Sequence, residues 1–297
     1  MKVKEPLAAE RKRLRPGQIL FTFLHLAPDL EQTQDLIHSN AICIAYETVT
    51  SPQGTLPLLT PMSEVAGRLA PQVGAHSLEK AQGGRGILLG GVPGVPAAEV
   101  VILGGGVSGT HAATIAVGMG AQVTVVDRSA EVLKRIAAQF GASISTAFST
   151  RATIAEAARR ADLLIGTVLV PGASAPKLVS RETVAGMKKG SVIVDVAIDQ
   201  GGCIETSHAT THSDPTYVVD GVVHYCVANM PGAVARTSTF ALNAVTLPLT
   251  LAIANKGWKG ALRDDPHLRA GLNVAEGRIT CAPVAEAHGL NVADIQL

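Results

Sequence analysis

The sequence predicts an α/β protein built on a doubly wound parallel sheet. Short apolar runs alternate with helical patterns along most of the 297 residues, and a glycine-rich turn joins one such run to a helix. The apolar residues are mainly aliphatic, since aromatic residues make up only 3% of the chain. Aliphatic strands that alternate with helices are typical of parallel sheets with both faces covered.

Composition limits the classes of function. A chain of 297 residues suggests about two domains. The net charge of +1 gives no electrostatic reason to expect a nucleic-acid partner. The four cysteines lie too far apart in the sequence for zinc-ligand spacing, and nothing requires a disulfide. We therefore expect a cytoplasmic protein without a metal site. His208 and His212 are four residues apart, but residues 209–211 favour a loop.

The first third of the chain contains two predicted strands, residues 18–23 and 41–46. A helix is predicted between them over residues 28–39, with Asp29 and Glu31 in its first turn, where the helix dipole favours negative charge. Residues 61–82 form a long helical pattern that Pro71 should bend. Residues 83–96, rich in glycine and proline, indicate a loop.

A dense series of strands and helices follows. Its predicted strands are residues 100–103, 122–126, 163–170, 192–196 and 222–227. Its predicted helices are residues 111–119, 130–140, 153–161 and 181–188. After Pro231 the pattern is helical to about Lys256. Polar residues and Pro248 interrupt residues 240–254, so we expect a buried, kinked helix and no membrane span.

The strongest motif follows the strand at residues 100–103. Gly104, Gly106 and Gly109 make the G-x-G-x-x-G pattern between a strand and a helix. The first glycine permits a tight turn, the second lets the backbone approach a pyrophosphate, and the third lets helix and strand pack closely. A second strand ends at Asp127, where a carboxylate accepts hydrogen bonds from ribose hydroxyls. The pattern favours a Rossmann-type NAD-binding domain, the alternative being an ordinary tight turn.

Asp127 also argues for NAD over NADP, because its charge would repel a 2′-phosphate. Arg128 weakens that argument, since a neighbouring arginine can serve a phosphate. We place the NAD-binding domain at residues 58–235. Residues 1–57 and 236–297 then form a second, discontinuous α/β domain for the substrate.

Several segments together resemble the alanine dehydrogenase and transhydrogenase family. They are residues 2–6 (KVKEP), 23–27 (FLHLA), 61–67 (PMSEVAG), 104–109 (GGGVSG), 196–202 (VAIDQGG) and 227–232 (VANMPG). The resemblance covers essentially the whole chain. It implies NAD-dependent oxidative deamination of L-alanine to pyruvate and ammonia, the reverse amination, and a homohexamer. Family members carry a further N-terminal stretch with an arginine that binds the substrate carboxylate, so we expect the substrate domain to be incomplete at its N-terminus.

The resemblance also assigns roles to individual residues. It makes His25 the general acid/base, a role that suits the ordinary pKa of histidine, although position alone favours a structural histidine. It makes Lys4 the residue that polarises the substrate carbonyl and holds its carboxylate. It makes Asp199 a catalytic partner near the nicotinamide ribose, whereas Asp195 is a lower-ranked carboxylate.

The same resemblance implies a set of residues that line the dinucleotide site, mostly through backbone contacts. Besides the three glycines and Asp127, they are Ser63, Val107, Ser108, Ser149, Val168, Leu169, Val196, Ala197, Ile198, Asp199, Val227, Ala228, Asn229 and Met230. Two alternatives remain. One is the NAD(H)-binding subunit of a transhydrogenase, against which His25 and Lys4 argue. The other is a catalytically impaired NAD-binding remnant.

Overall fold

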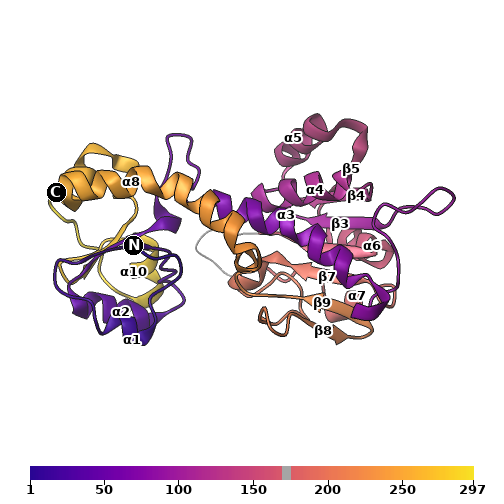
Figure 1. Cartoon of the computed structure of the whole chain (residues 1–297), viewed down its shortest axis with the longest axis horizontal. Helices are drawn as coiled ribbons and strands as arrows, with labels where there is room; N and C mark the ends of the chain where they lie inside the picture. The colour runs from indigo at the N-terminus through magenta and orange to yellow at the C-terminus, as the bar shows by residue number, and fades with distance from the viewer. Residues whose placement is uncertain (169–174) are drawn as a thin grey trace. The chain divides into compact units, whose positions relative to one another are not determined.

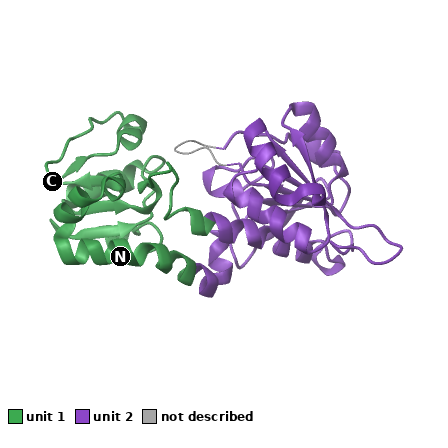
Figure 2. Ribbon diagram, turned by 90° about the horizontal axis from the view of Figure 1, so that it is seen from above, with its two compact units in different colours: residues 1–62, 239–297 green, residues 63–238 purple. Residues whose placement is uncertain are grey.

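The computed structural model describes residues 1–168 and 175–297, and the chain divides into two compact units. Unit 1 comprises residues 1–62 and 239–297, and unit 2 comprises residues 63–238 (Figure 2). Each unit has a sheet with a buried core on both faces. The predicted α/β fold is therefore confirmed.

Unit 2 is built on a seven-stranded sheet with the order β5-β4-β3-β6-β7-β9-β8 (Figure 1). Its strands are β3 (Glu99–Leu103), β4 (Gln122–Asp127), β5 (Ile144–Phe148), β6 (Leu163–Gly166), β7 (Val192–Asp195), β8 (Thr216–Val219) and β9 (Val222–Tyr225). All neighbours pair in parallel except β8, which is antiparallel to β9. Within this sheet the first strand along the chain is β3, and β4 and β5 follow on one side of it. The chain then crosses to β6 on the other side of β3, so the topological switch point lies between β3 and β6.

Helices cover both faces of this sheet. They are α3 (Thr60–Ser77, which begins in unit 1), α4 (Val107–Gly118), α5 (Ala130–Phe140), α6 (Arg151–Arg160) and α7 (Arg181–Ala185), with 3-10 turns η2 (Lys80–Gln82), η3 (Gly141–Ser143), η4 (Val196–Gln200) and η5 (Met230–Val234). Val100 and Ile102 of β3 enter one core cluster, and Val101 and Leu103 enter the other. This alternation explains why β3 is apolar from Val100 to Leu103.

The structure departs from the predicted elements of unit 2 in several places. The strand predicted over residues 163–170 ends at Gly166, and the helix predicted over residues 181–188 ends at Ala185. The helix predicted over residues 61–82 ends at Ser77, and α4 begins four residues earlier than residue 111. Strands β5 and β8 were not predicted. Both lie at sheet edges, where none of their residues is fully buried. β5 has the mixed sequence ISTAF, and β8 is only four residues long. The Asp220-Gly221 pair, with positive φ at both residues, is the turn signal that marks the β8–β9 hairpin.

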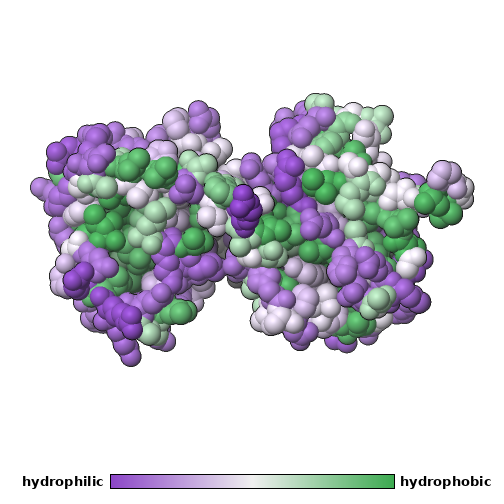
Figure 3. Space-filling view, viewed as in Figure 1, coloured by the Kyte–Doolittle hydropathy of each residue, from purple (hydrophilic) through white to green (hydrophobic). Residues whose placement is uncertain are grey.

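A loop before β3 projects from unit 2. Val92 and Val95 form an isolated bridge within it, and their side chains are exposed. Figures 1 and 3 show this loop at the right, with hydrophobic residues along it. It corresponds to the predicted glycine- and proline-rich loop at residues 83–96.

Unit 1 has a four-stranded sheet with the order β1-β2-β10-β11. Its elements are α1 (Ala8–Arg11), β1 (Ile19–Thr22), α2 (Leu30–Ser39), β2 (Ile42–Ala45), η1 (Tyr46–Thr48), α9 (Pro266–Arg269), β10 (Leu272–Ala275), β11 (Arg278–Ile279) and α10 (Ala282–His288). β1 and β2 are parallel, as their crossover helix α2 requires, whereas β10 is antiparallel to β2.

The long helix α8 (Ala235–Asp264) starts in unit 2 and continues into unit 1. Its helical geometry is interrupted at Gly257, which has φ 67° and ψ 162°. Within the described residues, one helix, spanning residues 230–264, is long and apolar enough to cross a membrane by length and composition alone. It is less buried than the sequence predicts, since Leu247 and Leu251 are exposed.

Candidate active site

The turn between β3 and α4, residues 104–109, requires glycine for reasons that the structure makes explicit. We call it the glycine turn. Gly104 has φ +99°, which disfavours any side chain. A Cβ at Gly109 would lie 1.8 Å from the carbonyl oxygen of Gly104. A Cβ at Gly106 would meet no atom within 4 Å. The first and third glycines therefore permit the turn itself, and the second leaves open space in front of α4.

That open space suits an anion. Gly106 is the N-cap of α4 and supplies no capping side chain. The first N–H groups of a helix lack partners within the helix, and the helix dipole favours negative charge there. A phosphate group fits this chemistry, so the residues present fit the pyrophosphate of a dinucleotide.

Asp127 stands at the end of β4, beside this turn. One carboxylate oxygen accepts a hydrogen bond from the Gly105 N–H at 2.7 Å, and the other accepts from the Ser129 N–H at 2.8 Å. Ser149 follows β5 and donates its N–H to the Asp127 carbonyl at 2.9 Å. The ends of three neighbouring strands are thereby held together at the carboxyl edge of the sheet.

Helix α3 also packs against the glycine turn. The Ser108 hydroxyl donates a hydrogen bond to the Ser63 carbonyl at 2.9 Å. A Cβ at Gly67 would lie 2.2 Å from the Ser108 carbonyl oxygen, so the two helices touch through backbone. This contact brings Ser63 to the turn although 45 residues separate Ser63 from Ser108.

The remaining predicted cofactor residues of unit 2 follow the carboxyl ends of other strands. Val168 follows β6, residues 196–199 follow β7 within η4, and residues 227–230 follow β9. Ala197, Ile198, Val227 and Met230 are buried. Leu169 lies outside the described residues. The strand order thus gathers the described members of the set at one edge of the sheet.

Asp199 is exposed and is oriented by backbone. The Asn229 N–H lies 3.2 and 3.3 Å from its two carboxylate oxygens. Asn229 has φ 58°, a left-handed conformation that asparagine tolerates. Asp199 therefore presents a charged group from η4 that is fixed by the segment after β9.

Asp195 has a different position and a different use. It is fully buried, and it accepts N–H hydrogen bonds from Ala197 at 3.1 Å and Cys203 at 3.0 Å. Burial raises the pKa of its carboxyl above the ordinary value. Asp195 organises the turn that carries Asp199.

In unit 1, His25 follows β1 in a left-handed conformation with φ 47°. Its Nδ1 pairs with the Glu5 carboxylate, and its ring stacks on Phe23 with 5.7 Å between centroids. Its backbone N–H donates to Glu47 Oε1 at 2.6 Å. Because Nδ1 faces Glu5, Nε2 is the nitrogen left to exchange a proton, and the side chain is 46% exposed.

Two opposing effects set the pKa of His25. Burial of the ring lowers the pKa, but the hydrogen bond to Glu5 and the negative charges of Glu47 and Glu5 outweigh it, so the pKa is raised above its ordinary value. The pKa of Glu5 is also set by opposing effects. Burial raises this pKa, but the hydrogen bond from His25 and the charge of Lys4 dominate and lower it to about 2. Glu5 is therefore ionised beside the histidine at neutral pH.

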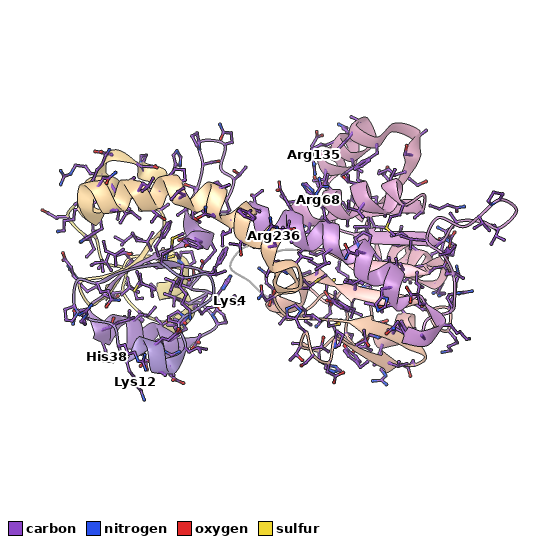
Figure 4. All side chains as sticks on the ribbon, viewed as in Figure 1. Lys4, Lys12, His38, Arg68, Arg135 and Arg236 are labelled. Atoms are coloured by element: carbon purple, nitrogen blue, oxygen red, sulfur yellow. The ribbon has the colours of Figure 1, made fainter. Side chains whose placement is uncertain are left out.

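Lys4 precedes this pair on a segment that is attached to β1. The Lys2 N–H donates to the Phe21 carbonyl at 3.1 Å, and the Phe23 N–H donates to the Val3 carbonyl at 3.2 Å. The Thr22 hydroxyl lies 3.0 Å from the Lys4 carbonyl. The Lys4 ammonium lies 3.6 Å from Glu5, and the side chain is 45% exposed. Figure 4 labels Lys4. The structure thus brings Lys4, Glu5 and His25 together.

Sequence reasoning missed two of these residues. Glu5 lies within the KVKEP segment, next to Lys4, but a charged residue among charged neighbours indicates only a solvated surface. Glu47 follows β2 and accepts N–H hydrogen bonds from Leu24 and His25. A carboxylate after the strand that neighbours β1 is the signal that could have identified Glu47, because parallel strands end at the same edge.

Among the described residues, no group of three His, Cys, Asp or Glu side chains is placed to hold a metal ion. The His208 ring stacks on Tyr217 with 3.7 Å between centroids. His212 Nε2 lies 3.1 Å from the Asn229 carbonyl oxygen and so helps to fix that turn.

Comparisons with known proteins identify the family of this chain. Residues 1–66 match the family model "Alanine dehydrogenase/PNT, N-terminal domain", and residues 70–282 match "Alanine dehydrogenase/PNT, C-terminal domain". The chain is 61% identical to alanine dehydrogenase of Halomonas elongata over 99% of this chain and 79% of that protein. It is 58% identical to alanine dehydrogenase of Bacillus subtilis over 97% and 76%, respectively.

Solved structures give the same result. An L-alanine dehydrogenase structure, 54% identical, superposes with a TM-score of 0.93 over 97% of this chain and 80% of that one. A transhydrogenase from Sinorhizobium meliloti, 27% identical, has a TM-score of 0.78 over 94% of this chain and 80% of that one.

Proposed function

The chain belongs to the alanine dehydrogenase/PNT family, and on that premise we propose that it catalyses NAD-dependent oxidative deamination of L-alanine to pyruvate and ammonia, and the reverse amination. The family and the Rossmann-type fold imply a pyridine nucleotide. When bound, this cofactor accepts the hydride that leaves Cα of the amino acid. The observation that carries the proposal on the substrate side is the Lys4–Glu5–His25 group.

His25 handles protons in this proposal. Its Nε2 accepts a proton from the substrate amine and releases it to solvent; it then accepts a proton from the water that adds to the imine and passes this proton to the departing ammonia, while Nδ1–H remains bonded to Glu5. The carboxylate holds one tautomer and stabilises the ring when it carries a positive charge. In the amination direction the same nitrogen returns the proton.

Lys4 and Asp199 supply charge. The Lys4 ammonium holds the substrate carboxylate and polarises the oxygen that becomes the ketone of pyruvate. The Asp199 carboxylate, exposed and held by the Asn229 N–H, stabilises the positively charged imine. Neither role needs a metal ion.

The finer identity of the cofactor rests on Asp127. Its carboxylate lies at the end of β4, where ribose hydroxyls donate hydrogen bonds and a 2′-phosphate is repelled. This supports NAD over NADP. We also propose that residues 58–235 form the NAD-binding domain and that residues 1–57 and 236–297 form the substrate domain.

A direct test uses the purified 297-residue chain. We expect it to oxidise NADH when given pyruvate and ammonium, and we expect His25→Gln to lower kcat by about 10²–10⁴-fold. His38→Gln, on α2 of the same unit, is the matched control and should keep wild-type activity. Tight NADH binding without turnover in the wild-type chain would contradict the dehydrogenase proposal and leave the cofactor site intact.

A homohexamer in the cytoplasm is the assembly and location we propose. The exposed apolar residues Leu247 and Leu251 on α8 support subunit contacts, and the four free cysteines suit a reducing compartment. Light scattering after size-exclusion chromatography tests the assembly, with Leu251→Lys expected to reduce the mass. A mass of one chain for the wild type would contradict it.

A further inference from the structure

Both backbone polar groups of Gly105 are bonded to other parts of unit 2. The Gly105 N–H donates to Asp127 Oδ2 at 2.7 Å. The Gly105 carbonyl accepts a hydrogen bond from Arg135 Nη2 at 2.6 Å and another from the Thr110 hydroxyl at 3.2 Å. Arg135 lies on α5, outside the glycine motif, and Figure 4 labels it.

Peptide geometry links this contact to the cofactor site. The Gly105 carbonyl and the Gly106 N–H belong to one planar trans peptide, so they point in opposite directions. Since the carbonyl faces Arg135, the N–H of Gly106 faces away from it. Gly106 is exposed, and a Cβ there would meet no atom within 4 Å.

Close packing and a charged hydrogen bond both act on Gly105. A Cβ at Gly105 would lie 2.6 Å from Val132 of α5, so α5 already approaches the turn closely. The glycine pair itself permits many backbone conformations. A charged donor on the carbonyl selects one of them, because hydrogen bonds from a charged group are about twice as strong as neutral ones.

We propose that Arg135 is a positioning residue for the pyridine nucleotide. It holds the Gly105–Gly106 peptide so that the Gly106 N–H donates to the cofactor pyrophosphate. The inference rests on the proposed function only in that the glycine turn binds the cofactor. It adds a residue that the glycine motif does not contain.

The test compares four proteins: wild type, Arg135→Met, Arg135→Lys and the control Lys134→Met. Lys134 is the neighbouring cation on α5 and contacts Glu131 at 2.9 Å. The dissociation constants of NADH, ADP-ribose and adenosine are measured by fluorescence and calorimetry, together with the melting temperature. Adenosine lacks the pyrophosphate, so it separates the proposed contact from a general disturbance of the site.

For Arg135→Met we expect the Kd of NADH and ADP-ribose to rise by about tenfold, with adenosine unchanged. KM for NADH should rise in parallel, while kcat at saturation stays near wild type. Arg135→Lys, which keeps a charged donor, should restore part of the affinity at a wild-type melting temperature. Lys134→Met should match the wild type.

Three results would overturn the inference. The first is an unchanged Kd for NADH in Arg135→Met while the wild type binds tightly, which leaves the cofactor site standing. The second is an equal loss for adenosine, which makes Arg135 a purely structural residue. The third is no NADH binding by the wild type, which also removes the proposed function. If Arg135→Met does not fold, Arg135→Gln, which removes the charge, takes its place, and an unchanged Kd for NADH in that variant would overturn the inference.

Discussion

The two units hold their candidate sites by different means. In unit 2 the site is mostly backbone: glycines that exclude side chains, the first N–H groups of α4, and Asp127 bonded to Gly105 and Ser129. In unit 1 it is mostly side chains, namely Lys4, Glu5 and His25, which are partly exposed.

This difference predicts which substitutions each unit tolerates. A backbone site is lost when its geometry changes, so the fold of unit 2 and its cofactor affinity should fail together. A side-chain site is lost when its charges change, so substitutions in unit 1 should alter rates and pH dependence and leave the fold intact. The predictions below test that contrast.

Of the four changes that test this contrast, Gly109→Ala in unit 2 is expected to have the largest effect. A Cβ there would lie 1.8 Å from a backbone oxygen, which moves only if the turn opens. We expect the Kd of NADH, measured by fluorescence, to rise by at least about 100-fold and the melting temperature to fall. Gly118→Ala at the end of α4 is the control, because a Cβ there would meet no atom within 4 Å. Its free energy of unfolding should rise by about 0.5–1 kcal/mol. Wild-type affinity in Gly109→Ala would mean that the turn is not the cofactor site.

In unit 1, Glu5→Gln should change the rate and its pH dependence without changing NADH affinity. The carboxylate raises the pKa of His25, so removing its charge lowers that pKa. The neutral ring, which is the base for deamination, then persists to lower pH. We expect the acid limb of the kcat/KM profile for alanine to move to lower pH, and the plateau kcat to fall by about tenfold. An acid limb at the wild-type position would exclude Glu5 as the partner of the titrating group.

Asp127→Asn sharpens the comparison, because it alters a side chain within the backbone site. Asparagine keeps an acceptor oxygen for the Gly105 N–H but loses the charge that repels a 2′-phosphate. We expect the ratio of the Kd values for NADPH and NADH to fall by about tenfold. Arg128→Gln serves as the control for the neighbouring charge. If the ratio is the same in Asp127→Asn and the wild type, Asp127 does not select NAD.

The smallest effect is expected in the core of unit 1. Tyr46 is fully buried, and its hydroxyl has no hydrogen-bond partner among the described residues. Because a buried unpaired hydroxyl is unfavourable, Tyr46→Phe should raise the free energy of unfolding by about 1 kcal/mol. Activity should not change. Urea unfolding measures this, and a loss of stability would indicate that the hydroxyl has a partner.

The prediction of the fold succeeded where the apolar pattern matches one period clearly, either helical or that of a strand buried on both faces. The helix predicted at residues 130–140 is α5, and the central strands β3, β4 and β7 were predicted. Prediction failed for β10, where the buried Asn273 interrupts the apolar pattern and donates to the Thr48 hydroxyl at 2.8 Å. A buried polar residue with a distant partner gives no local signal.

The candidate site residues also differ in whether the local sequence could identify them. Gly104, Gly106, Gly109 and Asp127 could be found from spacing alone, because a tight turn and a charged strand end are local requirements. His25, Lys4 and Asp199 needed the family resemblance. Glu5, Glu47 and Arg135 were missed, because each acts through a hydrogen bond to a residue far along the chain.

By itself, the sequence determined that this chain has a doubly wound sheet and a glycine turn between its first strand and helix. Periodicity and glycine spacing depend on local backbone geometry, which a sequence records directly. Only the tertiary structure decided that Glu5 orients His25, that Asp195 is buried while Asp199 is exposed, and that Arg135 holds the Gly105 carbonyl. These facts depend on which distant segments meet, because burial and pairing set the charge and direction of a polar group.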